Sequence, residues 1–303
     1  MLDVLIALVP ALLLSLYFFG VGALVVTATS VASCVLFEFL ITRFLLKQTP
    51  RLTDMSAVLT GVLLAFNVPS NLPIWIIIIG ALVAIGIGKM AFGGLGQNIF
   101  NPALTGRIFL LIAYPVQMTT WPNSGVMSYA VTDAETGATP LSLFTRFVNG
   151  ETGVLSQLPS SLEMLIGQTG GSLGEVSALA LLIGFVYMLC RKTITWHTPV
   201  AIFASAFIMA LICYGFDAEL AVKQLLSGGL MLGAIFMATD YVTSPMNNKG
   251  CLIYGACIGA LTIIIRRFGA YPEGMSFAIF IMNAFVPLIN TYVKPTRFGV
   301  VKK

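Results

Sequence analysis

Long apolar runs separated by short polar segments divide this chain along its whole length. Runs of about 20 apolar residues match the thickness of a bilayer's hydrocarbon core, and a helix pairs its own backbone polar groups there. The pattern therefore predicts an all-α integral membrane protein with about ten transmembrane helices. The predicted spans lie near residues 2–19, 21–46, 55–67, 74–92, 101–117, 176–190, 198–215, 224–239, 251–268 and 275–292.

Two of these runs are short and lie beside proline and asparagine. The third run is followed by the polar stretch 67–71 and the eighth by the stretch 244–248. Irregular backbone at membrane depth is tolerated only where protein or a water-filled cavity surrounds it. We therefore expect short, broken or re-entrant helices at these two places.

The two halves of the chain resemble each other weakly. Residues 59–65 and 98–103 parallel residues 226–232 and 281–287 in composition and order. About five spans in each half is an odd number, so the halves would insert in opposite senses, as in the inverted repeats of transporters and channels. The predicted units are a first transmembrane repeat at 1–117, an extracytoplasmic loop at 118–175 and a second transmembrane repeat at 176–303.

Composition excludes an ordinary soluble domain. Hydrophobic residues make up 58% of the chain and charged residues only 9%, with a mean hydropathy of +0.96. Soluble domains carry roughly a quarter charged residues. The first apolar run begins at Leu2 without a basic leader and continues into a second run, so we expect a first span rather than a cleavable signal peptide.

The basic residues indicate the orientation. With the N-terminus inside, most of them fall in cytoplasmic segments, as the positive-inside rule requires. Both termini are then predicted to be cytoplasmic, loop 118–175 extracytoplasmic, and the chain multi-pass in the cell (inner) membrane. Because the charges are dispersed, no nucleic-acid partner is expected. The five cysteines include no CxxC pair, so neither a disulfide framework nor a metal site is indicated.

The predicted loop contains one unusual motif, Asp133-Ala-Glu-Thr136-Gly137-Ala138-Thr139. Asp, Thr and Gly all favour turns, so an ordinary turn is one interpretation. A chemical interpretation is that the small Gly137-Ala138 pair leaves the Thr139 hydroxyl accessible to a modifying enzyme. That hydroxyl is able to hold a phosphate ester.

Five motifs in this order resemble those of a known family, the D subunit of the Rnf electron-transport complex. That subunit is related to the B subunit of the sodium-pumping NADH:quinone oxidoreductase. The resemblance covers nearly the whole chain. It rests on residues 92–103, 114–121, 138–141, 237–240 with Thr243, and 268–274.

The resemblance implies a membrane flavoprotein subunit of a translocase that couples electron transfer between ferredoxin and NAD to movement of sodium ions or protons. It implies FMN bound covalently through its phosphate to Thr139, and a flavin transferase that recognises Asp133, Thr136, Gly137 and Ala138. A non-covalent riboflavin is also implied, at no position the sequence reveals. Electron entry and NAD chemistry would belong to the partner A, B, C, E and G subunits, so no catalytic residue is expected in this chain. The family's usual polar segment before the first span is missing here, which puts its contacts with neighbouring subunits in doubt.

Two groups of polar residues near the membrane are further candidates. Gln97, Asn98 and Asn101 follow a glycine-rich segment, for which close helix packing is the alternative to contact with a flavin or an ion. Ionisable groups inside a membrane are costly, so Glu38, Arg107 and Asp240 are functional candidates. Asp240 with Thr243 offers oxygen ligands to a hard cation, and both are assigned with Glu38 to an ion path. The alternatives are that Asp240 caps a helix or pairs with Lys249, and that Glu38 pairs with Arg43.

A second class of function remains open from the sequence. Inverted five-span repeats also serve passive channels or permeases for small solutes, and a fold does not fix a function. Covalent flavin discriminates between the two.

Overall fold

The computed structural model describes residues 1–49, 52–122, 139–148, 150–167, 170–175, 177–269, 271 and 273–294. Every secondary-structure element in these residues is a helix, and no β-strand element occurs among them. This confirms the all-α class. Of the loop motif, Asp133, Thr136, Gly137 and Ala138 lie outside the described residues. Thr139 lies inside them.

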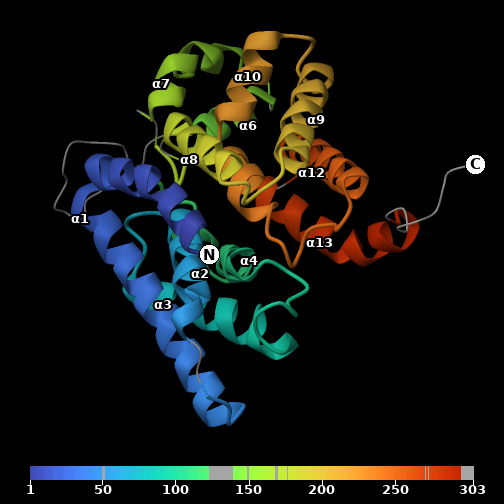
Figure 1. The fold of residues 1–303 in the computed structure, drawn as a ribbon. Helices are drawn as coiled ribbons and strands as arrows, with labels where there is room; N and C mark the ends of the chain where they lie inside the picture. The colour runs from blue at the N-terminus through green and yellow to red at the C-terminus, as the bar shows by residue number, and fades with distance from the viewer. Residues whose placement is uncertain are drawn as a thin grey trace, which may run out of the picture.

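Helix α1 (Leu2–Leu40) contains the first two predicted spans. Gly20 has φ 58° and ψ −135°, so the chain turns there while helical structure resumes on both sides. Only glycine adopts this conformation without steric cost. The helix continues into a π-helix, η1 (Ile41–Leu45), and together they form the long left edge of Figure 1.

The rest of the first part is built from shorter helices against α1. They are a short 3-10 helix η2 (Leu52–Asp54), α2 (Ser56–Phe66), α3 (Ile74–Leu82) with its π-helical continuation η3 (Val83–Ile87), a 3-10 turn η4 (Met90–Phe92), and α4 (Pro102–Ala113). Gly61 permits the closest approach of α2 to α1, because a Cβ atom there would lie 2.7 Å from Cα of Val31.

The segment predicted as a loop carries several short helices. These are α5 (Pro115–Met118), α6 (Pro140–Val148), the 3-10 helix η5 (Thr152–Gln157) and α7 (Ser161–Ile166). Ser160 and Glu163 form a reciprocal capping box at the start of α7. The described part of residues 118–175 is therefore largely folded rather than an open connection.

The last part of the chain comprises α8 (Ala178–Cys190), α9 (His197–Cys213), α10 (Ala218–Leu226), α11 (Leu230–Leu232) with the π-helix η6 (Gly233–Met237), α12 (Asn248–Phe268) and α13 (Met275–Tyr292). The chain bends by 68° between α10 and α11. Gly228, with φ +65°, lies in this break. The eighth predicted span is thus broken, as expected. The bend lies near its start, between residues 226 and 230, whereas the prediction pointed to the polar stretch 244–248.

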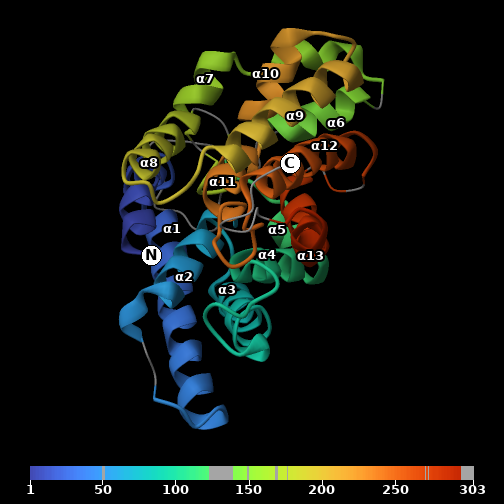
Figure 2. The same cartoon turned by 45° about the vertical axis from the view of Figure 1, so that its right-hand side comes forward.

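Four helices within the described residues are long and apolar enough to cross a membrane, or up to five if the bent pair counts as one span. Four shorter apolar helices accompany them: α2, α4, α8 and α9. Helices α9 and α12 pack closely at Gly255 and Gly259. Figures 1 and 2 show α4 beside α13, where the first and last parts of the chain meet. Helix length and composition therefore support a membrane protein, and the ten-span count stays a prediction.

Candidate functional site

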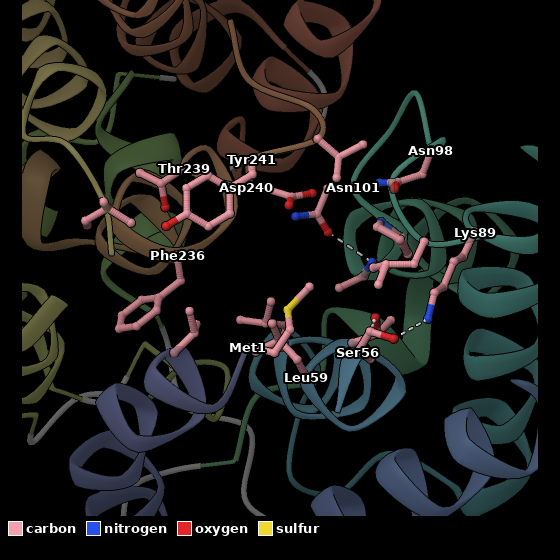
Figure 3. A pocket seen from close by; sticks show the side chains of 18 of the residues that line it. Met1, Ser56, Leu59, Lys89, Asn98, Asn101, Phe236, Thr239, Asp240 and Tyr241 are labelled. Atoms are coloured by element: carbon pink, nitrogen blue, oxygen red, sulfur yellow. Dashed lines mark hydrogen bonds between the residues drawn. The ribbon is translucent and has the colours of Figure 1, made fainter. Parts of the chain in front are cut away.

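A large cavity lies where the two parts of the chain meet. Its walls come from the start of α1, from α2, from residues 89–103 and from residues 236–242. Most of the lining is apolar, including Leu59, Leu63 and Phe236. Ligand sites in proteins are typically lined mostly by apolar side chains, with a few convergent polar groups. This cavity, hereafter the large cavity, has that character (Figure 3).

Asn101 joins the two parts of the chain at this cavity. It caps α4, since its Oδ1 accepts hydrogen bonds from the backbone N–H of Ala103 at 3.1 Å and of Leu104 at 3.4 Å. Its Nδ2 donates to the carbonyl of Met237 at 3.3 Å. An N-cap asparagine fixes where a helix begins. Here it also fixes the position of η6 relative to α4.

Asp240 lies on the same wall, three residues after η6. Its carboxylate accepts a hydrogen bond from the Thr243 hydroxyl at 3.4 Å. Figure 3 shows its side chain close to that of Asn101. No basic residue among those described forms an ion pair with Asp240, so the predicted alternative of a pair with Lys249 is wrong.

Glu38 is held by a partner that the sequence did not indicate. Lys89 Nζ lies 2.6 Å from Glu38 Oε2 and 2.6 Å from Ser56 Oγ, and the side chains of Lys89 and Glu38 are 2% and 8% exposed. Arg43 is not the partner, so that alternative is also wrong. Lys89 and Ser56 both line the large cavity, which places the Glu38 pair at its edge.

The predicted polar triad is only partly assembled. Asn98 and Asn101 are buried in the wall of the cavity, whereas Gln97 is exposed and does not line it. The positive φ angles of Gly93, Gly94 and Gly96 turn the chain so that consecutive side chains face different ways. The structure therefore does not bring Gln97 into this site.

A second, smaller cavity, hereafter the Thr139 cavity, lies beside the folded part of the predicted loop. Trp121, Met164, Gly228 and Glu273 line it together with Thr139, whose residue surface is 9% exposed. Thr139 Oγ1 accepts a hydrogen bond from the Ser142 N–H at 3.2 Å, in the first turn of α6. The hydroxyl is therefore placed at a helix N-terminus and within a cavity.

Two buried arginines lie near the Thr139 cavity. Arg107 donates to Asn67 Oδ1 at 2.7 Å and to Ser276 Oγ at 2.7 Å, and it forms an ion pair with Glu273. Arg266 donates instead to three oxygens of the bend between α10 and α11: the Gln224 carbonyl at 2.6 Å, Gln224 Oε1 at 3.0 Å and the Ser227 carbonyl at 2.8 Å. No described carboxylate lies within ion-pair distance of Arg266.

Sequence reasoning identified Arg107 but not its surroundings. The charge pattern alone does not set Lys89 or Arg266 apart from the other basic residues, and Glu273 lies within the motif at 268–274. The useful signal was present, because charged residues within apolar runs require partners. In the part of the chain that the structure describes, no group of three or more His, Cys, Asp or Glu residues is placed to hold a metal ion.

Comparison with known proteins gives one consistent result. The model of the NQR2, RnfD, RnfE family matches residues 1–299. The D subunit of the Na⁺-translocating ferredoxin:NAD⁺ oxidoreductase complex of Acetobacterium woodii is 46% identical over 304 residues, covering 100% of this chain and 91% of the relative. The D subunit of the proton-translocating complex of Clostridium ljungdahlii is 39% identical over 306 residues, covering 99% and 91%. The D subunit of the ion-translocating oxidoreductase complex of Escherichia coli K12 is 38% identical over 333 residues, covering 99% and 93%.

Proposed function

This chain belongs to the NQR2, RnfD, RnfE family, and from that premise we propose that it is the membrane-embedded D subunit of an Rnf-type complex. Such a complex couples electron transfer between ferredoxin and NAD⁺ to the translocation of sodium ions or protons, as the names of the relatives state for those proteins. The observation that carries the proposal is the family match over residues 1–299. The partners we propose are the other subunits of the complex.

We further propose that the chain crosses the membrane about ten times in two inverted halves. Short or broken helices support this in both parts, with α2 in the first and the bent α10–α11 pair in the second. Each part also has a π-helix, η3 or η6, that leads to the large cavity. Both termini are proposed to be cytoplasmic, which puts the Thr139 cavity toward the outer face.

Two features around Thr139 support the proposal of a covalently attached flavin phosphate. A phosphate ester on Thr139 Oγ1 would sit at the N-terminus of α6, where backbone N–H groups and the helix dipole favour an anion. Arg266 adds a buried positive charge nearby, since a Cβ atom on Gly228 would lie 3.1 Å from its Nη2. With Thr139 only 9% exposed, attachment requires this cavity to open to the flavin transferase.

Bound FMN would supply one-electron redox chemistry that amino-acid side chains do not. The chain's own residues hold it and shape its surroundings. Thr139 is the anchor, Trp121 and Met164 provide apolar wall, and Glu273 with Arg107 sets the local charge. These side chains also keep water away from the attachment oxygen.

The large cavity is the place we propose for the non-covalent riboflavin. Its walls are mostly apolar, as a flat aromatic ring system would require, and Asn98 and Asn101 are buried amides in the wall that would face the polar edge of such a ring. Asp240, Thr243 and Glu38 are proposed to belong to the ion path beside it. The carboxylate of Asp240 has no ion-pair partner among the described residues, which suits a group that binds and releases a cation.

Covalent flavin is the decisive test. We expect the denatured wild-type protein, expressed with its flavin transferase, to fluoresce as a flavoprotein in a gel, and Thr139→Ala to be dark although inserted in the membrane. Thr145→Ala, a threonine change in the same helix α6, is the matched control and should stay fluorescent. A fluorescent Thr139→Ala protein would move the site, with Thr136 as the next candidate. A dark wild type would favour the passive channel.

Ion coupling is tested at Asp240. We expect Asp240→Asn to abolish ion transport by the assembled complex, because the amide cannot hold a cation by charge. The control is Asp217→Asn, which changes an exposed N-cap of α10 to another good capping residue. Undiminished coupled transport by Asp240→Asn would remove this residue from the ion path.

A further inference from the structure

Buried polar groups connect the large cavity to the Thr139 cavity. Asn101, in the wall of the large cavity, donates to the carbonyl of Met237 at 3.3 Å. Asn67 contacts the sulfur of the same Met237, with Nδ2 at 3.6 Å from Sδ. Arg107 donates to Asn67 at 2.7 Å and pairs with Glu273, which lines the Thr139 cavity. A series of side chains, hereafter the polar chain, thus runs from one cavity to the other.

The polar chain is closed to solvent. Asn67 and Arg107 are each 2% exposed. It is also the meeting point of the broken elements, because Asn67 ends α2, while Glu273 and Ser276 flank the start of α13. Polar groups at this depth are costly unless each finds a partner. Apart from the thioether of Met237, a cation that followed this series across the interface would meet oxygen and nitrogen atoms.

Charge along the polar chain is asymmetric. Within the polar chain the guanidinium of Arg107 lies on the Asn67 side, whereas the carboxylate of Glu273 lies in the wall of the Thr139 cavity, as does that of Glu175. Arginine keeps its charge at any physiological pH. A cation entering from the large cavity would meet the positive group first, and a fixed arginine is a recognised electrostatic barrier to cations in membrane pores.

We propose that Arg107 is the electrostatic barrier that prevents passive movement of cations between the two cavities, and that Glu273 positions it there. This inference rests on the proposed function, because only an ion-translocating protein needs a barrier against leakage along its own path. The alternative is that the ion pair merely holds α4 against α13. The two ideas predict different effects on passive cation entry. A barrier requires that only the loss of the Arg107 charge increases entry, whereas a purely structural ion pair would make the loss of either partner equivalent.

The experiment measures passive cation entry into liposomes that contain the purified complex, without ferredoxin or NAD⁺, using radioactive sodium and an internal pH dye. Arg107→Gln removes the positive charge and should raise cation entry about tenfold or more over wild type, since each tenfold change in rate corresponds to a modest change in barrier. Glu273→Gln keeps the positive charge and should leave cation entry at or below the wild-type level. Equal leaks in both variants, or no leak in either, would overturn the proposal.

Two further variants keep the test decisive if Arg107→Gln fails to assemble. The double variant Arg107→Gln/Glu273→Gln removes both members of the ion pair and should still leak, so a tight double variant counts against the barrier. Arg266→Gln removes the other buried arginine, which does not touch the polar chain, and should not leak. Coupled transport by wild type on the same liposomes tests the proposed function separately, because leak is measured without turnover.

Discussion

The buried pair of Glu38 and Lys89 gives a quantitative test of the structure around the large cavity. Lys89 lies 2.6 Å from both Glu38 and Ser56, and the side chains of Glu38 and Lys89 are 8% and 2% exposed. Removing one partner of a buried ion pair leaves an uncompensated charge, which typically costs about 3–5 kcal/mol. Lys89→Met should fall in this range, because it leaves the Glu38 carboxylate and the Ser56 hydroxyl without their common donor.

The double variant Glu38→Gln/Lys89→Met separates the pair from its surroundings. It contains no buried charge at this site, so its loss of stability should be smaller than that of Lys89→Met alone and well below the sum of the two single changes. The measurement is reversible unfolding in mixed detergent micelles, followed by the fluorescence of Trp75, Trp121 and Trp196.

The exposed pair of Arg146 and Glu151 is the control. Both side chains are 50% exposed, and the carboxylate raises the pKa of Arg146 through a hydrogen bond and its charge. Solvent screens such a pair, so the Arg146→Gln variant should unfold under the same conditions as the wild-type protein. If the effects of the two changes at Glu38 and Lys89 simply add, the two side chains do not interact, and the described geometry of the pair is refuted.

Other predictions concern packing and the cavity wall. Gly259→Ala places a Cβ atom 2.4 Å from the carbonyl oxygen of Ile202 and should destabilise the protein by about 1–3 kcal/mol in thermal unfolding. In the control Gly86→Ala, the added Cβ atom meets nothing closer than 3.6 Å, so this change should not destabilise the protein. Equal losses of stability in the two variants would reject the close approach of α9 and α12. Asn98→Ala should lower the non-covalent flavin content of the purified complex while Gln97→Ala leaves it unchanged, measured after acid extraction. Retention in Asn98→Ala would exclude that amide from the site.

The helical class and most element positions follow from sequence because they depend on local properties. Apolar runs, the proline and asparagine that open α4, and the glycine at position 20 act on their immediate neighbours. Helix lengths were less predictable. The bend between α10 and α11 depends on the backbone of Gly228, and a left-handed glycine has no signature that distinguishes it from a packing glycine.

The site was predictable in its chemistry and less so in its pairing. Asn101, Asp240 and Thr139 stood out by residue type and motif, and the structure places each in a cavity wall or beside one. Lys89 and Glu38 are 51 residues apart in sequence and come together only through tertiary packing. The rule that places basic residues at the cytoplasmic surface led to the opposite expectation for Lys89.

The wall of the large cavity depends on the number of residues in the π-helix η6, as well as on their identity. A π turn closes with a bond from residue i to i+5, and so accommodates one residue more than an α turn. In η6 the additional residue changes the direction in which the chain leaves the helix at Ala238. Asp240 follows two residues later in the cavity wall. The length of the segment 233–237, and not only its composition, therefore helps to determine where this carboxylate lies.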